Sequence, residues 1–257
     1  MPLLIATPTQ KPDTWVRAFN RLAPEVEVRV WPDCGDPADI EFIVAWETPP
    51  GFFAAFPDLK CIASLGAGVD FLLHDPDLPE GVFITRVIDP SITRQMSEYV
   101  VLHALRFCRH SPRFDLDAAG EIWQPRIPLR PADLTVGIMG MGQLGTDAGR
   151  LLQHLDFPVS GWRKTARAIT GVDIFSGLEQ LPPFLERSRI LVCMLPLTPE
   201  TRGILAADLF VQLPRGAYVI NVARGRHLVE ADLLAANDTG HLAGACLDVF
   251  NTEPLPH

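Results

Sequence analysis

The stretch Leu134-Thr135-Val136-Gly137-Ile138-Met139-Gly140-Met141-Gly142-Gln143-Leu144-Gly145 decides the fold. Its first half is an apolar run of strand length, and its second half matches the pattern G-x-G-x-x-G. A helical pattern follows over 145–155, so the glycines stand between a predicted strand and a predicted helix. In this position glycine allows a tight turn and the close approach of a pyrophosphate to a helix N-terminus. We therefore expect a dinucleotide cofactor to be bound by Gly140, Gly142, Gln143, Leu144 and Gly145.

Two cations follow the next predicted strand, which spans 159–162. An NAD site carries Asp or Glu at this point, about 20 residues beyond the glycines, to bind the ribose. Here Arg163 and Lys164 occupy the position and would attract a 2′-phosphate instead. We therefore expect NADP(H) as the preferred cofactor, with NAD(H) as the alternative. A basic turn exposed to solvent, without a cofactor role, would also explain these two residues.

Apolar runs and helical spacings alternate on both sides of the glycine loop, which is typical of parallel α/β sheets. Strands are predicted over 3–6, 26–30, 40–45, 61–65, 134–139, 159–162, 190–195, 217–222 and 242–249. Helices are predicted over 14–22, 91–110, 145–155, 178–186 and 230–236. The fold class predicted is α/β, with two Rossmann-like or flavodoxin-like parallel-sheet domains, one over 1–98 and one over 99–257, and an active site in the cleft between them.

Composition excludes several classes of function. The 257 residues carry 31 Asp and Glu against 22 Lys and Arg, so the net charge of −9 argues against nucleic-acid binding. A hydrophobic content of 47% excludes a disordered chain, and no apolar run is long enough to span a membrane. The five cysteines form no Cys-x-x-Cys pair, so we expect no metal site and a reducing, cytoplasmic location.

Two further loops follow predicted strands and carry charged residues. One is Asn221-Val222-Ala223-Arg224-Gly225, and the other ends the segment 247–254 with Glu253-Pro254. Ligands of doubly wound sheets bind at the carboxyl ends of strands, so both loops are expected at the same crevice as the glycine loop. The sequence thus predicts an arginine and a carboxylate beside the cofactor.

Together these motifs resemble the D-2-hydroxyacid dehydrogenase family, and most of all its glyoxylate/hydroxypyruvate reductase A type. The resemblance covers essentially the whole chain in the order of the family. The segments that carry it are 66–70 (GAGVD), 95–99 (QMSEY), 123–125 (WQP), 140–145 (GMGQLG), 195–201 (LPLTPET), 221–230 (NVARGRHLVE) and 247–254 (LDVFNTEP).

The resemblance implies NADPH-dependent reduction of a small 2-oxo acid, glyoxylate or hydroxypyruvate, to glycolate or glycerate. Arg224 would bind the substrate carboxylate and carbonyl and stabilise the developing oxyanion. The other substrate contacts implied are Trp46 and the backbone of Ala67, Gly68 and Val69, with Trp123 as a weaker candidate. Further cofactor contacts implied are Leu195, Pro196, Thr201, Ala223 and Asp248. Family members are commonly dimers, so a homodimer is expected as well.

The family also implies a histidine acid paired with the carboxylate of Glu253. His257 stands only four residues after Glu253 in a proline-flanked tail, and we do not assign the role to it. His103, His110 and His227 are poor replacements by position. We therefore expect a natural truncation or an incomplete copy, without the family's C-terminal return helix.

Two alternatives remain open at this point. A non-catalytic dinucleotide-sensing protein of the same fold would need no acid, whereas the pair of Arg224 and Glu253 argues for an enzyme. An NAD-linked 2-hydroxyacid or phosphoglycerate dehydrogenase would share the motifs but would prefer NADH.

Overall fold

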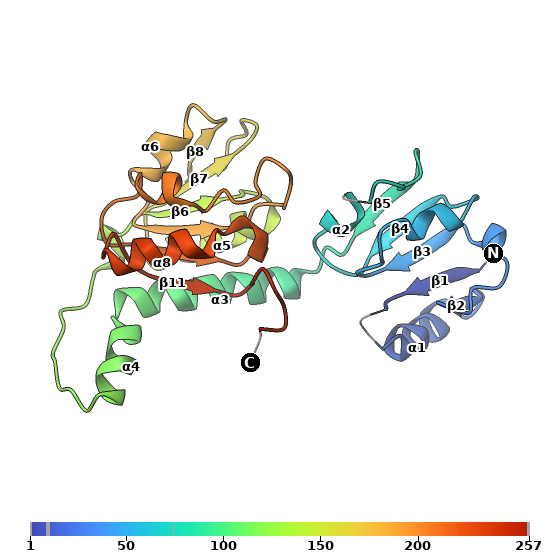
Figure 1. Cartoon of the computed structure of the whole chain (residues 1–257), viewed down its shortest axis with the longest axis horizontal. Coiled ribbons are helices and arrows are strands. Elements are labelled where there is room, and N and C mark those ends of the chain that lie inside the picture. Colours follow the sequence, from blue (N-terminus) through green and yellow to red (C-terminus); the bar gives the residue numbers. More distant parts are fainter. Residues whose placement is uncertain (1, 9–10, 74, 256–257) are drawn as a thin grey trace. The chain divides into compact units, whose positions relative to one another are not determined.

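The computed structural model describes residues 2–8, 11–73 and 75–255, and these form two compact units. The first unit ends at Asp89 and the second begins at Pro90 (Figure 1). This division falls before the long helix, whereas the sequence placed the boundary at 98/99, inside it. Across the described residues, no helix combines the length and apolar character needed to cross a membrane.

The first unit is a parallel sheet in the order β2-β1-β3-β4-β5. Its core consists of apolar side chains of β1, β3 and β4 with Phe53, Phe56 and Leu72 from the connecting segments. Its strands are β1 Leu3–Ala6, β2 Val28–Val30, β3 Phe42–Ala45, β4 Cys61–Ser64 and β5 Phe83–Arg86. Its helices are α1 Asp13–Leu22 and α2 Asp70–Leu73, with 3-10 turns η1 Pro37–Asp39 and η2 Phe52–Ala55.

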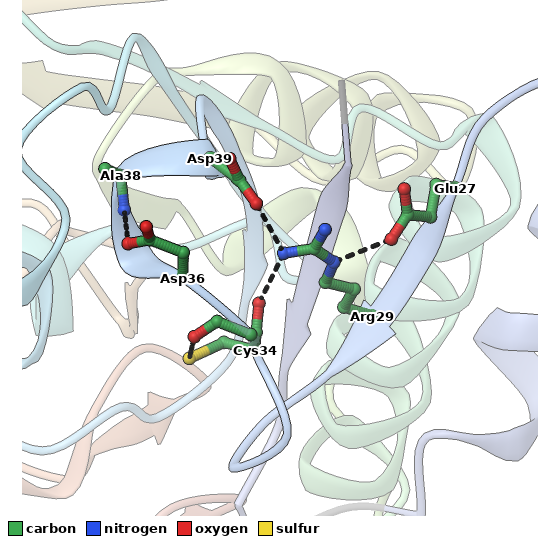
Figure 2. A network of polar contacts seen from close by, with 7 residues as sticks. Glu27, Arg29, Cys34, Asp36, Ala38 and Asp39 are labelled. Carbon is green, nitrogen blue, oxygen red and sulfur yellow. Dashed lines mark hydrogen bonds and ion pairs between the residues drawn. The ribbon is translucent and has the colours of Figure 1, made fainter.

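Arg29 of β2 forms hydrogen bonds that hold the loop connecting β2 to η1. Its Nε donates to Glu27 at 2.7 Å, and its Nη1 donates to the carbonyl of Cys34 at 2.8 Å and to Asp39 at 3.2 Å. Figure 2 shows the guanidinium between the two carboxylates, with the Cys34 carbonyl directed at the same nitrogen as Asp39. The edge strand β2, only three residues long, thus gains contacts that its short ladder does not provide.

The second unit is a parallel sheet in the order β11-β10-β9-β6-β7-β8. Its strands are β6 Val136–Met139, β7 Val159–Arg163, β8 Asp173–Ser176, β9 Ile190–Cys193, β10 Ala217–Asn221 and β11 Leu242–Leu247. Its helices are α3 Pro90–Cys108, α4 Ser111–Ala119, α5 Gln143–Gln153, α6 Leu181–Leu185, α7 Ala207–Phe210 and α8 Glu230–Asp238, with 3-10 turns η3 Pro131–Asp133 and η4 Gly225–His227. These two sheets confirm the predicted fold class of parallel α/β units.

Both faces of the second sheet are buried, because successive strand residues contribute to two separate cores. Ile138 packs with side chains of α3 and α5 on one face, whereas Met139 packs with α6, α7 and α8 on the other. Such two-sided burial explains why the central strands read as continuous apolar runs in the sequence. Since α3 helps to close one of these faces, it belongs to the second unit rather than to both.

Ser97 connects α3 to α5 inside this core. Its hydroxyl is fully buried and lies 2.8 Å from the carboxylate of Asp147 and 3.0 Å from the carbonyl of Thr93. We expect Ser97→Ala to lower the free energy of unfolding by about 1–2 kcal/mol, because the carboxylate loses a buried donor. Urea unfolding measures the change, with Thr165→Ala on an exposed loop as the control. Equal stability of the two variants would contradict this account.

Candidate functional site at the carboxyl edge of the second sheet

Four strands of the second sheet end in register along one edge. Met139 of β6 pairs with Cys193 of β9, Cys193 pairs with Asn221 of β10, and Asn221 pairs with Leu247 of β11. Neighbouring strands lie about 4.8 Å apart, so β6 and β10 end about 10 Å from each other. The strand order also reverses at β6, and ligands of doubly wound sheets bind at this switch point.

The glycine loop leaves β6 at this edge, and two of its glycines have no room for a side chain. Gly140 has a φ of +105°, and a Cβ on it would lie 2.5 Å from the carbonyl oxygen of Met194. A Cβ on Gly145 would lie 2.2 Å from the carbonyl oxygen of Gly140. Glycine is therefore required here for the turn and for helix packing, as the sequence pattern predicts.

Gly142 differs from the other two glycines because the space around it is open. A Cβ built on Gly142 meets no atom of the described residues within 4 Å, and the residue is exposed at the N-terminus of α5. Gln143 and Leu144 follow in the first helical turn, where backbone N–H groups lack carbonyl partners within the helix. These N–H groups and the helix dipole form a site suited to a pyrophosphate.

Arg163 ends β7 with a donor that the described residues do not satisfy. Its Nε is buried and has no hydrogen-bond partner among them, while Lys164 beside it is exposed. A buried guanidinium donor without an acceptor is costly unless an anion completes it. The geometry thus fits a phosphate group at the position where the sequence predicts the 2′-phosphate.

The loop after β9 is held in shape by its own hydroxyl groups. Thr201 Oγ1 donates to the carbonyl of Pro196 at 2.7 Å and accepts from the backbone N–H of Thr198 at 2.8 Å. Of the predicted contacts in this loop, Leu195 is buried in the core and Pro196 is exposed. The pKa of the Glu200 carboxyl is lowered, first by a hydrogen bond with Thr198, then by a backbone hydrogen bond of Glu200 itself, and third by the charge of Lys164. Glu200 is thus a neighbour of the basic end of β7 that sequence reasoning missed.

The arginine loop begins at Asn221, the last residue of β10. Asn221 is fully buried; its amide nitrogen donates to the carbonyl of Arg224 at 3.1 Å, and its amide oxygen accepts from the N–H of Ala223 at 3.2 Å. The Arg224 guanidinium in turn donates to the carbonyl of Ala223 at 2.7 Å. In the sequence, the signal for this contact is an amide residue directly before a charged loop.

Gly225 presses the arginine loop against the loop that follows β11. A Cβ on Gly225 would lie 1.9 Å from the carbonyl carbon of Phe250. In that second loop the exposed carboxylate of Glu253 accepts from the backbone N–H of Phe250 at 2.7 Å. The structure therefore brings the backbones around Arg224 and Glu253 together, as the strand order predicts. His257 lies outside the described residues.

Asp248, the first residue after β11, is exposed and lies near two side chains of α3. Burial raises the pKa of Tyr99, whose hydroxyl contacts the sulfur of Cys246 at 3.3 Å, and the charge of Asp248 adds to this rise. Burial and Arg106 lower the pKa of His103, whereas Asp248 opposes that shift. Asp248 thus has partners on α3 that the sequence did not indicate.

The substrate contacts predicted for the first unit gather at the carboxyl ends of β3 and β4. Ser64 Oγ lies 2.9 Å from the carbonyl of Gly68 and holds the turn that includes Ala67 and Val69. Trp46 follows β3, and its ring would clash with any Cβ on Gly66. Trp123 is 94% exposed in the irregular segment after α4.

The predicted residues are therefore divided between two groups. The cofactor residues, Arg224 and Glu253 lie along one edge of the second sheet, and Trp46, Ala67, Gly68 and Val69 lie at one edge of the first. An active site in a cleft between the units stays a prediction, as do the individual roles of these residues.

A parallel sheet with a glycine loop at its switch point and an unsatisfied arginine on the next strand defines a dinucleotide-binding α/β protein. Comparison with known families narrows this class. Residues 101–257 match the family model of the D-isomer specific 2-hydroxyacid dehydrogenase, NAD binding domain. The chain belongs to the D-isomer specific 2-hydroxyacid dehydrogenase family.

Relatives of known name and structure cover the whole chain. Glyoxylate/hydroxypyruvate reductase A of Yersinia enterocolitica is 39% identical over 261 aligned residues, which include 100% of this chain and 83% of the relative. A D-isomer specific 2-hydroxyacid dehydrogenase from Xanthobacter autotrophicus Py2, solved with NADPH and MES, is 42% identical with a TM-score of 0.93 over 99% of this chain and 82% of its own. An NADPH-dependent glyoxylate/hydroxypyruvate reductase from Sinorhizobium meliloti, solved with NADP and sulfate, is 39% identical with a TM-score of 0.90 over 100% of this chain and 83% of its own.

The contrast between Gly142 and Gly145 yields a prediction. Gly145→Ala should lower the free energy of unfolding by about 1–3 kcal/mol, because its Cβ meets backbone. Gly142→Ala should change stability by no more than about 1 kcal/mol, since a poorer helix cap is offset by a stiffer unfolded chain. It should nevertheless weaken NADPH binding at least about tenfold, because the methyl group occupies the approach of the pyrophosphate.

Urea unfolding and fluorescence titration with NADPH measure the two effects on the same variants. A Gly142→Ala variant that binds NADPH as tightly as the wild type would place the pyrophosphate elsewhere.

Proposed function

We propose that the protein is an NADPH-dependent reductase that converts a small 2-oxo acid, glyoxylate or hydroxypyruvate, into glycolate or glycerate. Arg224 carries the proposal, because the loop after β10 holds its guanidinium at the same sheet edge as the glycine loop. Both relatives named as glyoxylate/hydroxypyruvate reductases match this chain over its full length, which supports the choice of substrate class.

The cofactor is proposed to lie along the carboxyl edge of the second sheet. Gly142 and the N-terminus of α5 would receive the pyrophosphate, and Arg163 with Lys164 would bind the 2′-phosphate. Asp248 would contact the nicotinamide carboxamide, with Leu195, Pro196, Thr201 and Ala223 along the remaining surface. When bound, NADPH supplies the hydride for the reduction.

The chain's own residues are proposed to bind and polarise the substrate. Arg224 would hold the substrate carboxylate and stabilise the negative charge that develops on the carbonyl oxygen. The turn of Ala67, Gly68 and Val69 would offer backbone N–H groups to the carboxylate, and Trp46 would limit the size of the pocket. Glu253, held by the N–H of Phe250, would favour the charged form of an imidazole acid near it.

We propose a cytoplasmic location and a homodimeric assembly. The cysteines Cys34, Cys61, Cys108, Cys193 and Cys246 are all free thiols, which supports a reducing, cytoplasmic location. A homodimer, as expected from the family resemblance, is tested by light scattering of the full-length protein.

Turnover tests the proposal directly. The full-length protein should oxidise NADPH in the presence of glyoxylate or hydroxypyruvate, and Arg224→Gln should lower kcat/KM by about 10²–10³-fold, because the transition-state charge loses its donor. Arg226→Gln, two residues along and exposed, is the matched control and should keep wild-type rates. NADPH binding without turnover of either acid would instead favour a dinucleotide-sensing protein.

Cofactor preference is tested at Arg163. Arg163→Ser should raise the KM for NADPH about tenfold or more and leave the KM for NADH nearly unchanged, because only NADPH carries the 2′-phosphate. Arg167→Ser, on the exposed segment after β7, is the control for general loss of positive charge. Wild-type rates with NADH that equal or exceed those with NADPH would favour an NAD-linked dehydrogenase.

A further inference from the structure

His227 is a fully buried histidine that the proposed chemistry leaves unused. It ends the turn η4 directly after Arg224, and its side chain lies between two loops of the sheet edge. Nδ1 is 3.2 Å from the backbone nitrogen of Arg224, and Nε2 is 3.3 Å from the carbonyl oxygen of Pro196, 31 positions earlier in the chain. One imidazole therefore spans the loops that follow β9 and β10.

These contacts select one neutral form of the ring. The backbone N–H of Arg224 donates, so Nδ1 must carry a lone pair rather than a proton. Nε2 then carries the proton and donates to Pro196, whose carbonyl oxygen can accept both this bond and the hydroxyl of Thr201. A ring protonated at Nδ1 instead would place two acceptors, Nε2 and the Pro196 oxygen, against each other.

The carbonyl oxygen of Arg224 has hydrogen-bond donors other than the imidazole of His227, although Nδ1 lies 3.2 Å from it. That oxygen already accepts from the backbone N–H of His227 at 3.2 Å and from the side-chain amide of Asn221 at 3.1 Å. The backbone of Arg224 is thus bonded on its carbonyl side by Asn221 and on its N–H side by His227. The Asn221 and His227 side chains are both fully buried, whereas Arg224 is partly exposed.

We propose that His227 is a positioning residue: its neutral imidazole fixes the backbone of Arg224 against the Pro196 loop and so sets where the guanidinium meets the substrate. This inference rests on the proposed function, in which Arg224 binds the 2-oxo acid and the Pro196 loop lies along the cofactor. His227 itself touches neither ligand. Its effect is to preset the distance between the two loops before substrate arrives.

Three substitutions separate the two hydrogen bonds. His227→Asn keeps an acceptor near the position of Nδ1, His227→Gln keeps a donor near the position of Nε2, and His227→Ala keeps neither. We expect His227→Ala to lower kcat/KM for glyoxylate by about 10²-fold, as a misplaced binding group does, and His227→Asn to recover at least about tenfold of that loss. His227→Gln should recover less, because it offers the N–H of Arg224 no acceptor at the position of Nδ1.

The control is His241, another histidine whose ring nitrogen contacts a backbone carbonyl. Its Nε2 lies 2.7 Å from the carbonyl of Phe210, and it precedes β11 at the amino end of that strand. His241→Asn and His241→Gln should both keep the wild-type kcat/KM. Equal rates of His227→Asn and His227→Gln, or a wild-type rate in all three His227 variants, would overturn the proposal.

A second measurement does not depend on turnover. Amide hydrogen exchange at Arg224 should be slow in the wild type and in His227→Asn, and faster in His227→Gln and His227→Ala. If the wild type reduces neither 2-oxo acid but shows this exchange pattern, the proposed function fails and the link from His227 to Arg224 stands. If the wild type is active and exchange at Arg224 is the same in all variants, the positioning role of His227 is rejected and the proposed function remains.

Discussion

Three glycines along the carboxyl edge of the second sheet pack directly against the main chain of other residues, and the candidate site depends on these close contacts. Gly140 lies against Met194, Gly145 against Gly140, and Gly225 against Phe250. At each place a single methyl group would lie under 3 Å from main-chain atoms, which cannot move as a side chain can. The loop after β6 is therefore fixed to the loop after β9, and the loop after β10 to the loop after β11, without intervening side chains.

Polar side chains add hydrogen bonds within and between the loops that the glycines bring together. Asn221 serves as both donor and acceptor within one loop, and His227 serves as both between two loops. A carboxylate at either position would have no proton to donate and would carry a buried charge, which is far more costly than a satisfied amide or imidazole. The backbone of Arg224 is thus held by the side chains of Asn221 and His227.

Much of this architecture was predictable from the sequence because central parallel strands are buried on both faces. Their apolar runs identified β6, β9 and β10, whose residues lie in the two cores. The edge strands β5 and β8 escaped prediction, since Phe83 of β5 is 73% exposed and β8 begins with exposed Asp173. The domain boundary was placed inside α3 because sequence cannot show that this helix packs on α5.

The candidate site was predictable to a different degree. Motif residues such as Gly140, Arg163 and Arg224 lie at the ends of strands, so periodicity alone brings them to one edge. The contacts that orient them are of another kind, because His227 contacts the carbonyl of Pro196, 31 positions away in the chain. In a sequence, a histidine is a candidate acid. The fold instead gives His227 hydrogen bonds to two loops, which suit a positioning role.

The net charge of −9 adds a last constraint on how this site can attract anions. A net negative charge provides no overall long-range attraction for a dinucleotide phosphate or a 2-oxo acid. Screening limits such effects to about 8 Å at physiological ionic strength, within which local groups dominate. In the proposed function, the Nε of Arg163, the open helix N-terminus at Gly142 and the guanidinium of Arg224 are such groups. Recognition therefore depends on donors held in place at short range, which is why the rigidity of the strand edge matters more than overall charge.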